Sequence, residues 1–283
     1  MSTATDLTSL IAEAADALRG RRPVVLTGAG VSTDSGIPDY RGPDSPKHTP
    51  MTIAEFRGTT AARQRYWARS HVGWRRIRDA GPNGGHRALA ALQTADAAGL
   101  IITQNVDGLH QKAGSDAVID LHGRLDTVVC LACGTRSSRE ELQHRLAELN
   151  PDFGYDDAFG DAAEPLRLRP DGDAEVGDTS GFVVASCLVC GGVLKPDVVF
   201  FGENVPADKV RASYTNVDDA DALLVAGSSL TVMSGLRFVK RAAARSIPIV
   251  IINRGATRGD EWAILHIDAG CTEALESLAT ALE

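Results

Sequence analysis

The sequence predicts an α/β fold, a Rossmann-like doubly wound parallel sheet that carries a smaller inserted module. Helical patterns at about 7–18, 85–97 and 230–244 alternate with short apolar runs. Four of these runs are typical of buried parallel strands: 24–27, 100–103, 222–226 and 248–252. Polar or glycine-rich residues follow each run, and ligands of such sheets bind beyond the carboxyl ends of the strands. The four loops are therefore expected to meet in one crevice.

The loop after the first strand, TGAGVSTDSGIPDYRG, begins like a dinucleotide-binding loop. Gly28 and Gly30 follow the strand directly, but Thr33 stands where a dehydrogenase fingerprint has its third glycine. The region around Pro50 also lacks the acidic ribose-binding residue that the fingerprint places about 20 positions on. These departures argue against an ordinary NAD dehydrogenase.

The composition disfavours several classes of protein. The net charge is −8 and the isoelectric point about 5.4, and a large nucleic-acid or membrane surface would need clustered Lys and Arg. The first residues lack a basic start and include Asp6, Glu13 and Asp16, unlike a secretory or transit peptide. Apolar runs stay well below the roughly 20 residues that span a bilayer. We expect a cytoplasmic protein that binds neither nucleic acid nor membranes.

Two C-x2-C pairs, Cys130/Cys133 and Cys187/Cys190, predict a tetrahedral thiolate site for one structural Zn²⁺. A glycine follows each pair and lets the backbone turn around the metal. Because four thiolates close the coordination shell, this zinc should stabilise the fold and not act on substrate.

The cysteine pairs also suggest the domain organisation. Residues 127–194 are expected to form the inserted zinc-binding domain, with a long acidic insertion at about 151–181. Residues 1–126 and 195–283 are expected to form the Rossmann-like domain.

Polar residues follow the second strand in TQNVDGLH, where Gln104, Asn105 and Asp107 reach the expected crevice. Ligand binding is the favoured interpretation, and helix capping is the alternative. His122, in DLHG, is either a structural histidine or a general base that acts on a hydroxyl of the ligand. The segment KPDVVFFGE, residues 195–203, is either a strand that accepts an extended peptide or a plain core strand.

Together these motifs resemble the sirtuins, which are NAD-dependent protein lysine deacylases. GAGVSTDSGIPDYRG, TQNVDGLH, LHG, the paired cysteine knuckles, KPDVVFFGE, GSSL and INR occur in the order found in that family. The resemblance covers roughly residues 18–278. RQRYWARSHVGW, the long insertion and LKPDVVFFGE are most similar to class II sirtuins.

The resemblance implies that the Rossmann-like domain binds NAD. The GAG loop would hold the diphosphate, Gln104 and His122 would face the nicotinamide ribose, and Tyr40 replaces a phenylalanine found in many members. Cys271, at the start of the C-terminal helix, is expected in the core on pattern alone and near the adenosine by resemblance. The implied cofactor contacts are Gly28, Ala29, Gly30, Thr33, Asp34, Ile37, Pro38, Asp39, Tyr40, Arg41, Gln104, Asn105, Val106, Asp107, Gly227, Ser228, Ser229, Asn253, Arg254, Gly255 and Cys271.

In the implied reaction the acyl oxygen of the substrate lysine attacks the ribose carbon, and nicotinamide leaves. His122 then deprotonates a ribose hydroxyl that attacks the imidate carbon, and Gln104 and Asn105 are the other catalytic residues. The products are lysine, nicotinamide and an O-acyl-ADP-ribose, so NAD is a co-substrate. The residues expected to hold the peptide as a strand are Val198, Val199, Phe200, Phe201, Gly202 and Glu203.

Tyr66 and Arg69 have the Y-x-x-R spacing of desuccinylating sirtuins and fall on one helix face. Because an arginine fork matches a carboxylate, one hypothesis is a preference for acidic or bulky acyl groups, and the alternative is a plain helix-surface pair. There are two alternatives to a deacylase. One is a protein mono-ADP-ribosyltransferase, and the other is a non-catalytic zinc-stapled module that senses NAD or binds protein. We expect a monomer whose partners are acyl-lysine proteins or peptides.

Overall fold

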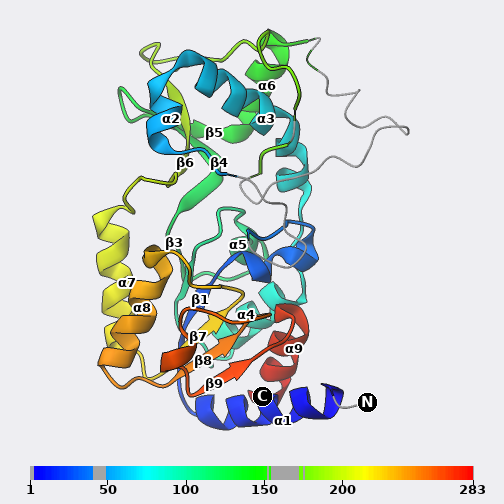
Figure 1. Cartoon of the computed structure of the whole chain (residues 1–283), viewed down its shortest axis with the longest axis vertical. Coiled ribbons are helices and arrows are strands. Elements are labelled where there is room, and N and C mark those ends of the chain that lie inside the picture. Colours follow the sequence, from blue (N-terminus) through cyan, green and yellow to red (C-terminus); the bar gives the residue numbers. More distant parts are fainter. Residues whose placement is uncertain (1–2, 41–48, 152, 154–171, 175, 283) are drawn as a thin grey trace. The chain divides into compact units, whose positions relative to one another are not determined.

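The chain forms two compact units in the computed structural model, which describes residues 3–40, 49–151, 153, 172–174 and 176–282 (Figure 1). Unit 1 comprises Met1–Ser45, Gly81–His122 and Val205–Glu283. Unit 2 comprises Pro46–Ala80 and Gly123–Asn204.

Unit 2 is larger than the inserted domain expected from the cysteine pairs. It also contains residues 46–80, 123–126 and 195–204, which the sequence-based boundaries assign to the Rossmann-like domain. The physical reason is packing, because Phe56 and Trp67 are buried in the same hydrophobic cluster as Cys130 and Leu194. These side chains form one core and therefore one compact unit.

Unit 1 is built on a six-stranded sheet in the order β3-β2-β1-β7-β8-β9, and every pairing in it is parallel. The order runs outward from β1 in one direction and from β7 in the other, so the topological switch point lies between them. The predicted doubly wound sheet is confirmed. The strands are β1 (Val24–Thr27), β2 (Ile101–Thr103), β3 (Val118–Asp120), β7 (Leu223–Ala226), β8 (Ile249–Ile252) and β9 (Leu265–Ile267).

Sequence reasoning found the four central strands but not β3 and β9, which lie at the two edges of the sheet. All the residues of β1, β2, β7 and β8 are buried, as their apolar runs predict. The edge strands have three residues each; β3 is only half-buried, and a polar histidine interrupts β9. Such short segments carry no recognisable periodicity.

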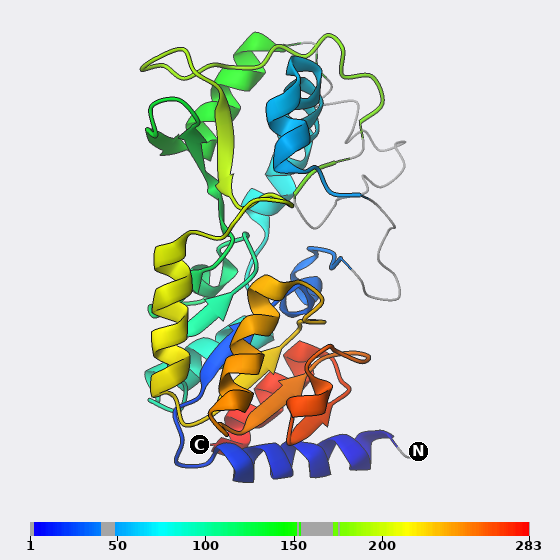
Figure 2. The same ribbon diagram turned by 60° about the vertical axis from the view of Figure 1, so that its left-hand side comes forward.

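Helices cover both faces of this sheet (Figure 1, Figure 2). On one face, Val25 and Leu224 pack with α1 (Thr3–Leu18), α4 (Gly84–Thr94) and α9 (Cys271–Leu282). On the other face, Leu26 and Val225 pack with α7 (Ala207–Asp219) and α8 (Met233–Ala244). Successive strand residues point to opposite faces, so each apolar run serves both layers. No helix in the described part of the chain is long and apolar enough to cross a membrane.

In its described residues, unit 2 combines a three-stranded antiparallel sheet, in the order β5-β4-β6, with three helices. Phe56 makes edge-to-face contacts with both Tyr66 and Phe200, with ring centroids 5.4 and 5.3 Å away. Such aromatic contacts stabilise a small core. The elements are α2 (Ile53–Gly58), α3 (Thr60–Asp79), β4 (Gly123–Cys130), β5 (Arg136–Ser138), α6 (Arg139–Leu149) and β6 (Leu194–Val198).

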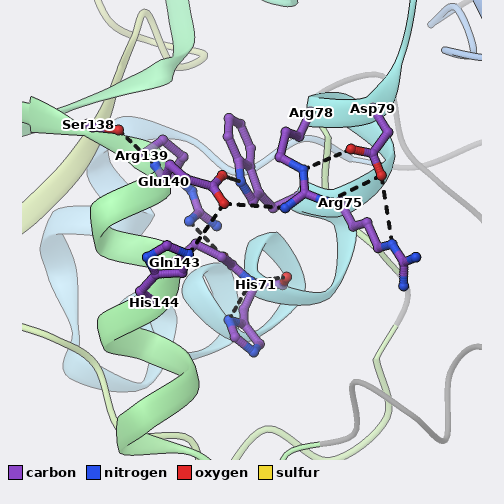
Figure 3. A network of polar contacts seen from close by, with 10 residues as sticks. His71, Arg75, Arg78, Asp79, Ser138, Arg139, Glu140, Gln143 and His144 are labelled. Carbon is purple, nitrogen blue, oxygen red and sulfur yellow. Dashed lines mark hydrogen bonds and ion pairs between the residues drawn. The ribbon is translucent and has the colours of Figure 1, made fainter.

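A buried polar network joins α3 to α6 (Figure 3). Arg139 is 1% exposed, and its guanidinium lies 4.8 Å from the ring centroid of Trp74. It donates to the carbonyl oxygen of Ser70 and to Gln143 Oε1, and the Gln143 amide donates to the carbonyl oxygen of His71. Burial and the charge of Arg139 lower the pKa of His71 to about 4. Because the network is hydrogen-bonded throughout, it fixes α3 against α6.

Candidate active site

The loops after β1 and β7 meet backbone to backbone at the switch point. The amide of Gly30 donates to the carbonyl oxygen of Gly227 at 2.9 Å. A Cβ atom would lie 2.8 Å from Gly227 Cα if built on Gly30, and 2.7 Å from Gly227 O if built on Gly28. Gly227 has a φ of 63°, and a Cβ there would lie 2.4 Å from the amide of Val31. Only glycine fits at these three positions, which suits close approach of a ligand's phosphates to the backbone.

The chain does not enter a long helix after this loop, which explains the missing third glycine. Two 3₁₀ turns follow instead, Ala29–Val31 and Thr33–Ser35, and Gly36 ends the second turn with a φ of 79°. Of the predicted contacts, Ala29, Thr33 and Asp34 lie in these turns, buried Ile37 follows with Pro38, Asp39 and Tyr40, and Arg41 falls outside the described residues.

The polar residues after β2 bind the first loop. The Asn105 amide donates to the carbonyl oxygen of Gly28 at 3.1 Å and to Ser32 Oγ at 3.0 Å. Ser32 Oγ donates to Asp107 Oδ2 at 2.7 Å, and Asp107 Oδ1 accepts from the amide of Leu109 at 2.9 Å. Asp107 therefore also binds the first amide of α5 (Leu109–Lys112), although the N-cap residue of this helix is Gly108. Val106 lies between these two anchored side chains.

Gln104 and His122 form the part of the site best suited to proton transfer. The Gln104 amide donates to Ser228 Oγ at 2.8 Å and to the carbonyl oxygen of Thr27 at 3.2 Å. His122 Nδ1 lies 2.9 Å from the carbonyl oxygen of Gln104, and its Nε2 lies 2.9 Å from Ser234 Oγ. Since a carbonyl oxygen only accepts, Nδ1 carries the proton and Nε2 is basic.

The electrostatic environment keeps His122 neutral. Burial is the largest cause of its lowered pKa, and the nearby charges of Lys209 and Arg237 lower it further. The hydrogen bond to the Gln104 carbonyl acts in the opposite direction. A neutral imidazole with a fixed tautomer is the form that can accept a proton from a ligand hydroxyl.

Two buried histidines that sequence reasoning missed lie beneath the same loops. His86 Nε2 is 3.5 Å from Ser32 Oγ, and His110 Nε2 is 2.9 Å from Thr27 Oγ1. Burial lowers the pKa of His86 to about 4 and that of His110 to about 3. Asn83 caps α4 through a reciprocal capping box with His86, so the sequence NGGH was the available signal.

The loops after β7 and β8 supply the remaining predicted contacts. Gly227, Ser228 and Ser229 follow β7, and Asn253, Arg254 and Gly255 follow β8. The Asn253 amide donates to the carbonyl oxygens of Arg254 at 2.8 Å and Gly255 at 3.0 Å, which fixes this turn. Cys271 begins α9, is 6% exposed and faces the carbonyl oxygen of Ile252; burial raises its pKa to about 12, so it stays a thiol.

The four predicted metal ligands converge in unit 2. The Sγ atoms of Cys130, Cys133, Cys187 and Cys190 all lie within 4.8 Å of one another. Two sulfur pairs, each with one sulfur from each knuckle, lie 3.5 Å (Cys130–Cys190) and 3.8 Å (Cys133–Cys187) apart. Four convergent sulfur ligands fit a tetrahedral zinc ion, because zinc prefers thiolates and Zn–S bonds of about 2.3 Å place the sulfurs around one centre.

The predicted peptide-binding segment is only partly a strand. β6 ends at Val198, Val199 and buried Phe200 follow it, and Phe201 makes an isolated parallel bridge with Thr52. Phe201 is 40% exposed, and Gly202 turns the chain with a φ of 80°.

An ion pair between buried Lys195 and half-buried Glu203 fixes this segment. Lys195 Nζ lies 3.1 Å from Glu203 Oε2 and also donates to the carbonyl oxygens of Pro196 and Val198. The same Glu203 oxygen accepts from the amide of Phe200 at 3.0 Å. These bonds connect Lys195, at the start of the segment, to Glu203 at its end. They therefore hold the segment in one conformation.

Tyr66 and Arg69 both lie on α3, as their spacing predicts. Tyr66 is 3% exposed, and its ring centroid is 5.3 Å from that of Phe200. The carbonyl oxygen of Arg69 accepts from the amide of Ala174, at the end of the long insertion. Tyr66 is thus adjacent to a residue of the predicted peptide-binding segment.

Comparison with known proteins identifies one family of similar proteins. The Sir2 family profile matches residues 28–234. "NAD-dependent protein deacetylase 1" of Mycobacterium avium is 58% identical over 94% of this chain and 93% of its own. "NAD-dependent protein deacetylase 1" of Streptomyces coelicolor is 52% identical over 97% of this chain and 91% of its own.

Solved structures show the same fold. A structure described as "Sir2-p53 peptide-NAD+" superposes with a TM-score of 0.74 at 29% identity and covers 95% of this chain and 96% of its own. Another, from "Structural Basis for the Mechanism and Regulation of Sir2 Enzymes", has a TM-score of 0.73 at 28% identity and covers 97% and 98% of the two chains. With a family profile that matches most of its length and relatives at more than half identity, the chain belongs to the Sir2 family.

Proposed function

We propose that this protein is an NAD-dependent protein lysine deacylase. The observation that carries the proposal is the neutral His122, whose Nδ1–H is held by the Gln104 carbonyl so that Nε2 is the basic atom. It lies with the glycine loops of β1 and β7 at the position where a doubly wound sheet binds dinucleotides. Curated relatives at 58% and 52% identity carry the name of this activity.

Different residues of unit 1 would bind different parts of NAD. The glycines at 28, 30 and 227 admit the diphosphate, and the loops 227–229 and 253–255 with Cys271 flank the adenosine. Asn105 and Asp107, fixed through Ser32, bind the nicotinamide end with Ile37 and Asp39. Bound NAD would supply an electrophilic ribose carbon for the acyl oxygen, with nicotinamide as the leaving group.

His122 Nε2 would accept a proton from a ribose hydroxyl, and the freed oxygen would attack the acyl carbon. Gln104 orients the base through its backbone carbonyl, while its side chain is held by Ser228. Removing water from this step protects the activated sugar from hydrolysis.

The acyl-peptide is assigned to unit 2. Val198–Glu203 would pair with the substrate backbone, and the Lys195–Glu203 pair keeps that segment in one conformation. Tyr66 touches Phe200, which supports a role for Tyr66 and Arg69 in selecting acidic or bulky acyl groups. One structural Zn²⁺ held by the four cysteines would stabilise the same unit.

The finer assignments belong to the same proposal. We assign the chain to the class II type, with its Rossmann-like NAD-binding domain and zinc-binding domain divided as the sequence suggests, apart from residues 46–80, 123–126 and 195–204, which belong to unit 2. Its partners are acyl-lysine proteins or peptides, and it acts as a cytoplasmic monomer without nucleic-acid or membrane partners, in keeping with a net charge of −8.

The test is nicotinamide release from NAD with acetyl-, succinyl-, glutaryl- and lipoyl-lysine peptides. His122→Ala should abolish peptide-dependent product formation, and the same change at exposed His144 should not. Arg69→Ala should remove activity on succinyl and glutaryl peptides and spare acetyl-lysine. NAD binding without release on any peptide would contradict the proposal and favour mono-ADP-ribosyl transfer or an NAD-sensing module.

A further inference from the structure

The N-terminal turn of α8 approaches the proposed catalytic pair with two small residues. Ser234 Oγ lies 2.9 Å from His122 Nε2, the basic atom of the site. Next to it, a Cβ on Gly235 would lie only 2.6 Å from Gln104 Oε1. Gly235 therefore leaves space for the Gln104 side chain beside the helix. Ser234 places its hydroxyl within hydrogen-bond distance of the His122 imidazole. Neither residue was singled out by the sequence motifs.

The direction of the hydrogen bond follows from the tautomer. His122 Nδ1–H donates to the carbonyl oxygen of Gln104, so Nε2 has only a lone pair to offer. Ser234 must then be the donor to Nε2 while the imidazole is neutral. In this state the Ser234 hydroxyl is hydrogen-bonded to His122 Nε2, the atom that must receive the proton from the substrate.

We propose that Ser234 is a positioning residue for His122 that serves both protonation states of the imidazole. This rests on the proposed deacylase function. Before proton transfer the hydroxyl donates to Nε2 and holds the ring in place. When a ribose hydroxyl takes its position, the Ser234 O–H bond rotates away without losing its proton.

The proton then moves from the ribose oxygen to Nε2, and the electron pair of the broken O–H bond stays on that oxygen for its attack on the acyl carbon. The new Nε2–H donates to a lone pair of Ser234 Oγ. A hydroxyl can play both parts because it is a donor and an acceptor on one atom. A bond to a charged imidazolium is also stronger than a neutral one.

The surroundings of His122 make this second role useful. Lys209 from α7 and Arg237 from α8 are the charged groups that act on the ring, and both oppose its positive form. The neighbouring acceptors are the Gln104 carbonyl oxygen, which already binds Nδ1–H, and Ser234 Oγ, which remains for Nε2–H. Loss of Ser234 should therefore slow the step that charges the imidazole.

Two rates separate this role from a merely structural one. Exchange of labelled nicotinamide into NAD, in the presence of acyl-peptide, requires the ribose carbon to react but no base. Formation of O-acyl-ADP-ribose requires His122 as well. We expect Ser234→Ala to lower product formation about tenfold, the effect of one lost hydrogen bond to a charged group, and to change exchange less than about twofold.

Ser234→Thr keeps the hydroxyl and should recover most of the product formation. Ser277→Ala, on the exposed side of α9, is the matched control and should change neither rate. Equal losses of exchange and product formation in Ser234→Ala would overturn the assignment, as would wild-type rates for both. Absence of peptide-dependent nicotinamide release from the wild-type protein would overturn the proposed function together with this inference.

Discussion

Replacing Lys195 by methionine tests whether the Lys195–Glu203 ion pair supports the peptide-binding segment. Lys195 is 4% exposed, and its ammonium bonds to Glu203 and to two backbone carbonyl oxygens. Methionine fills most of the volume but donates nothing. Removing one partner of a fully buried pair costs about 3–5 kcal/mol. The Glu203 side chain is 26% exposed, so water repays part of this, and we expect a loss of about 2–3 kcal/mol.

The measurement is urea unfolding followed by a probe of unit 2, together with steady-state kinetics. Below the unfolding transition, the KM for acyl-peptide should rise several-fold while the KM for NAD changes little, because the segment that moves belongs to unit 2. Glu203→Gln keeps an acceptor for the Phe200 amide but leaves the buried Lys195 ammonium without a counter-charge, so it should cost at least as much as Lys195→Met. Exposed Lys240→Met is the matched control. A loss below about 0.5 kcal/mol with an unchanged peptide KM would refute this reasoning.

Three further outcomes are expected. Gly30→Ala has no space for its Cβ and should weaken ADP-ribose binding at least tenfold by calorimetry, whereas Gly58→Ala, where nothing lies within 4 Å, should not; equal affinities would contradict the close approach of the loops. Cys133→Ser should lower the zinc content measured by native mass spectrometry and destabilise unit 2, and full retention of one zinc would exclude the proposed site. Buried His86 and His110 have pKa values of about 4 and about 3 when folded, against 6.5 when unfolded, so the unfolded chain binds protons that the folded chain refuses. The free energy of unfolding should therefore be full above about pH 6.5 and fall by on the order of 2 kcal/mol per histidine between pH 6.5 and 5, and a His110→Asn variant with an unchanged pH slope would argue against a neutral buried ring.

The sequence predicted the elements that depend on local pattern. Four apolar runs became β1, β2, β7 and β8 because strands buried on both faces need apolar residues throughout. The cysteine pairs converged because their spacing itself encodes the knuckles.

Features that depend on distant contacts were not predictable. Ser234 contacts His122, which lies 112 residues earlier in the chain, and the local sequence MSGL (residues 233–236) gives no sign of this contact. Residues 46–80 join unit 2 through contacts such as that of Arg139 with the Ser70 carbonyl, which no local pattern encodes. The sequence of residues 195–203 predicts one strand, but β6 ends at Val198. The rest of the segment leaves the sheet, and Glu203 returns to pair with Lys195.

The switch point between β1 and β7 also bears on how the protein is made. β1 is among the first segments to leave the ribosome, but its neighbour β7 is encoded far downstream; at the edge of this pairing Arg22 bonds to Asp221 across 199 residues. Until β7 is synthesised, β1 can pair only with β2. Closing so long a loop is slow, and unpaired apolar strands are prone to aggregation. During translation, β1 should therefore have one unpaired apolar edge until β7 is made. A chaperone would have most effect on the yield of folded protein at this stage.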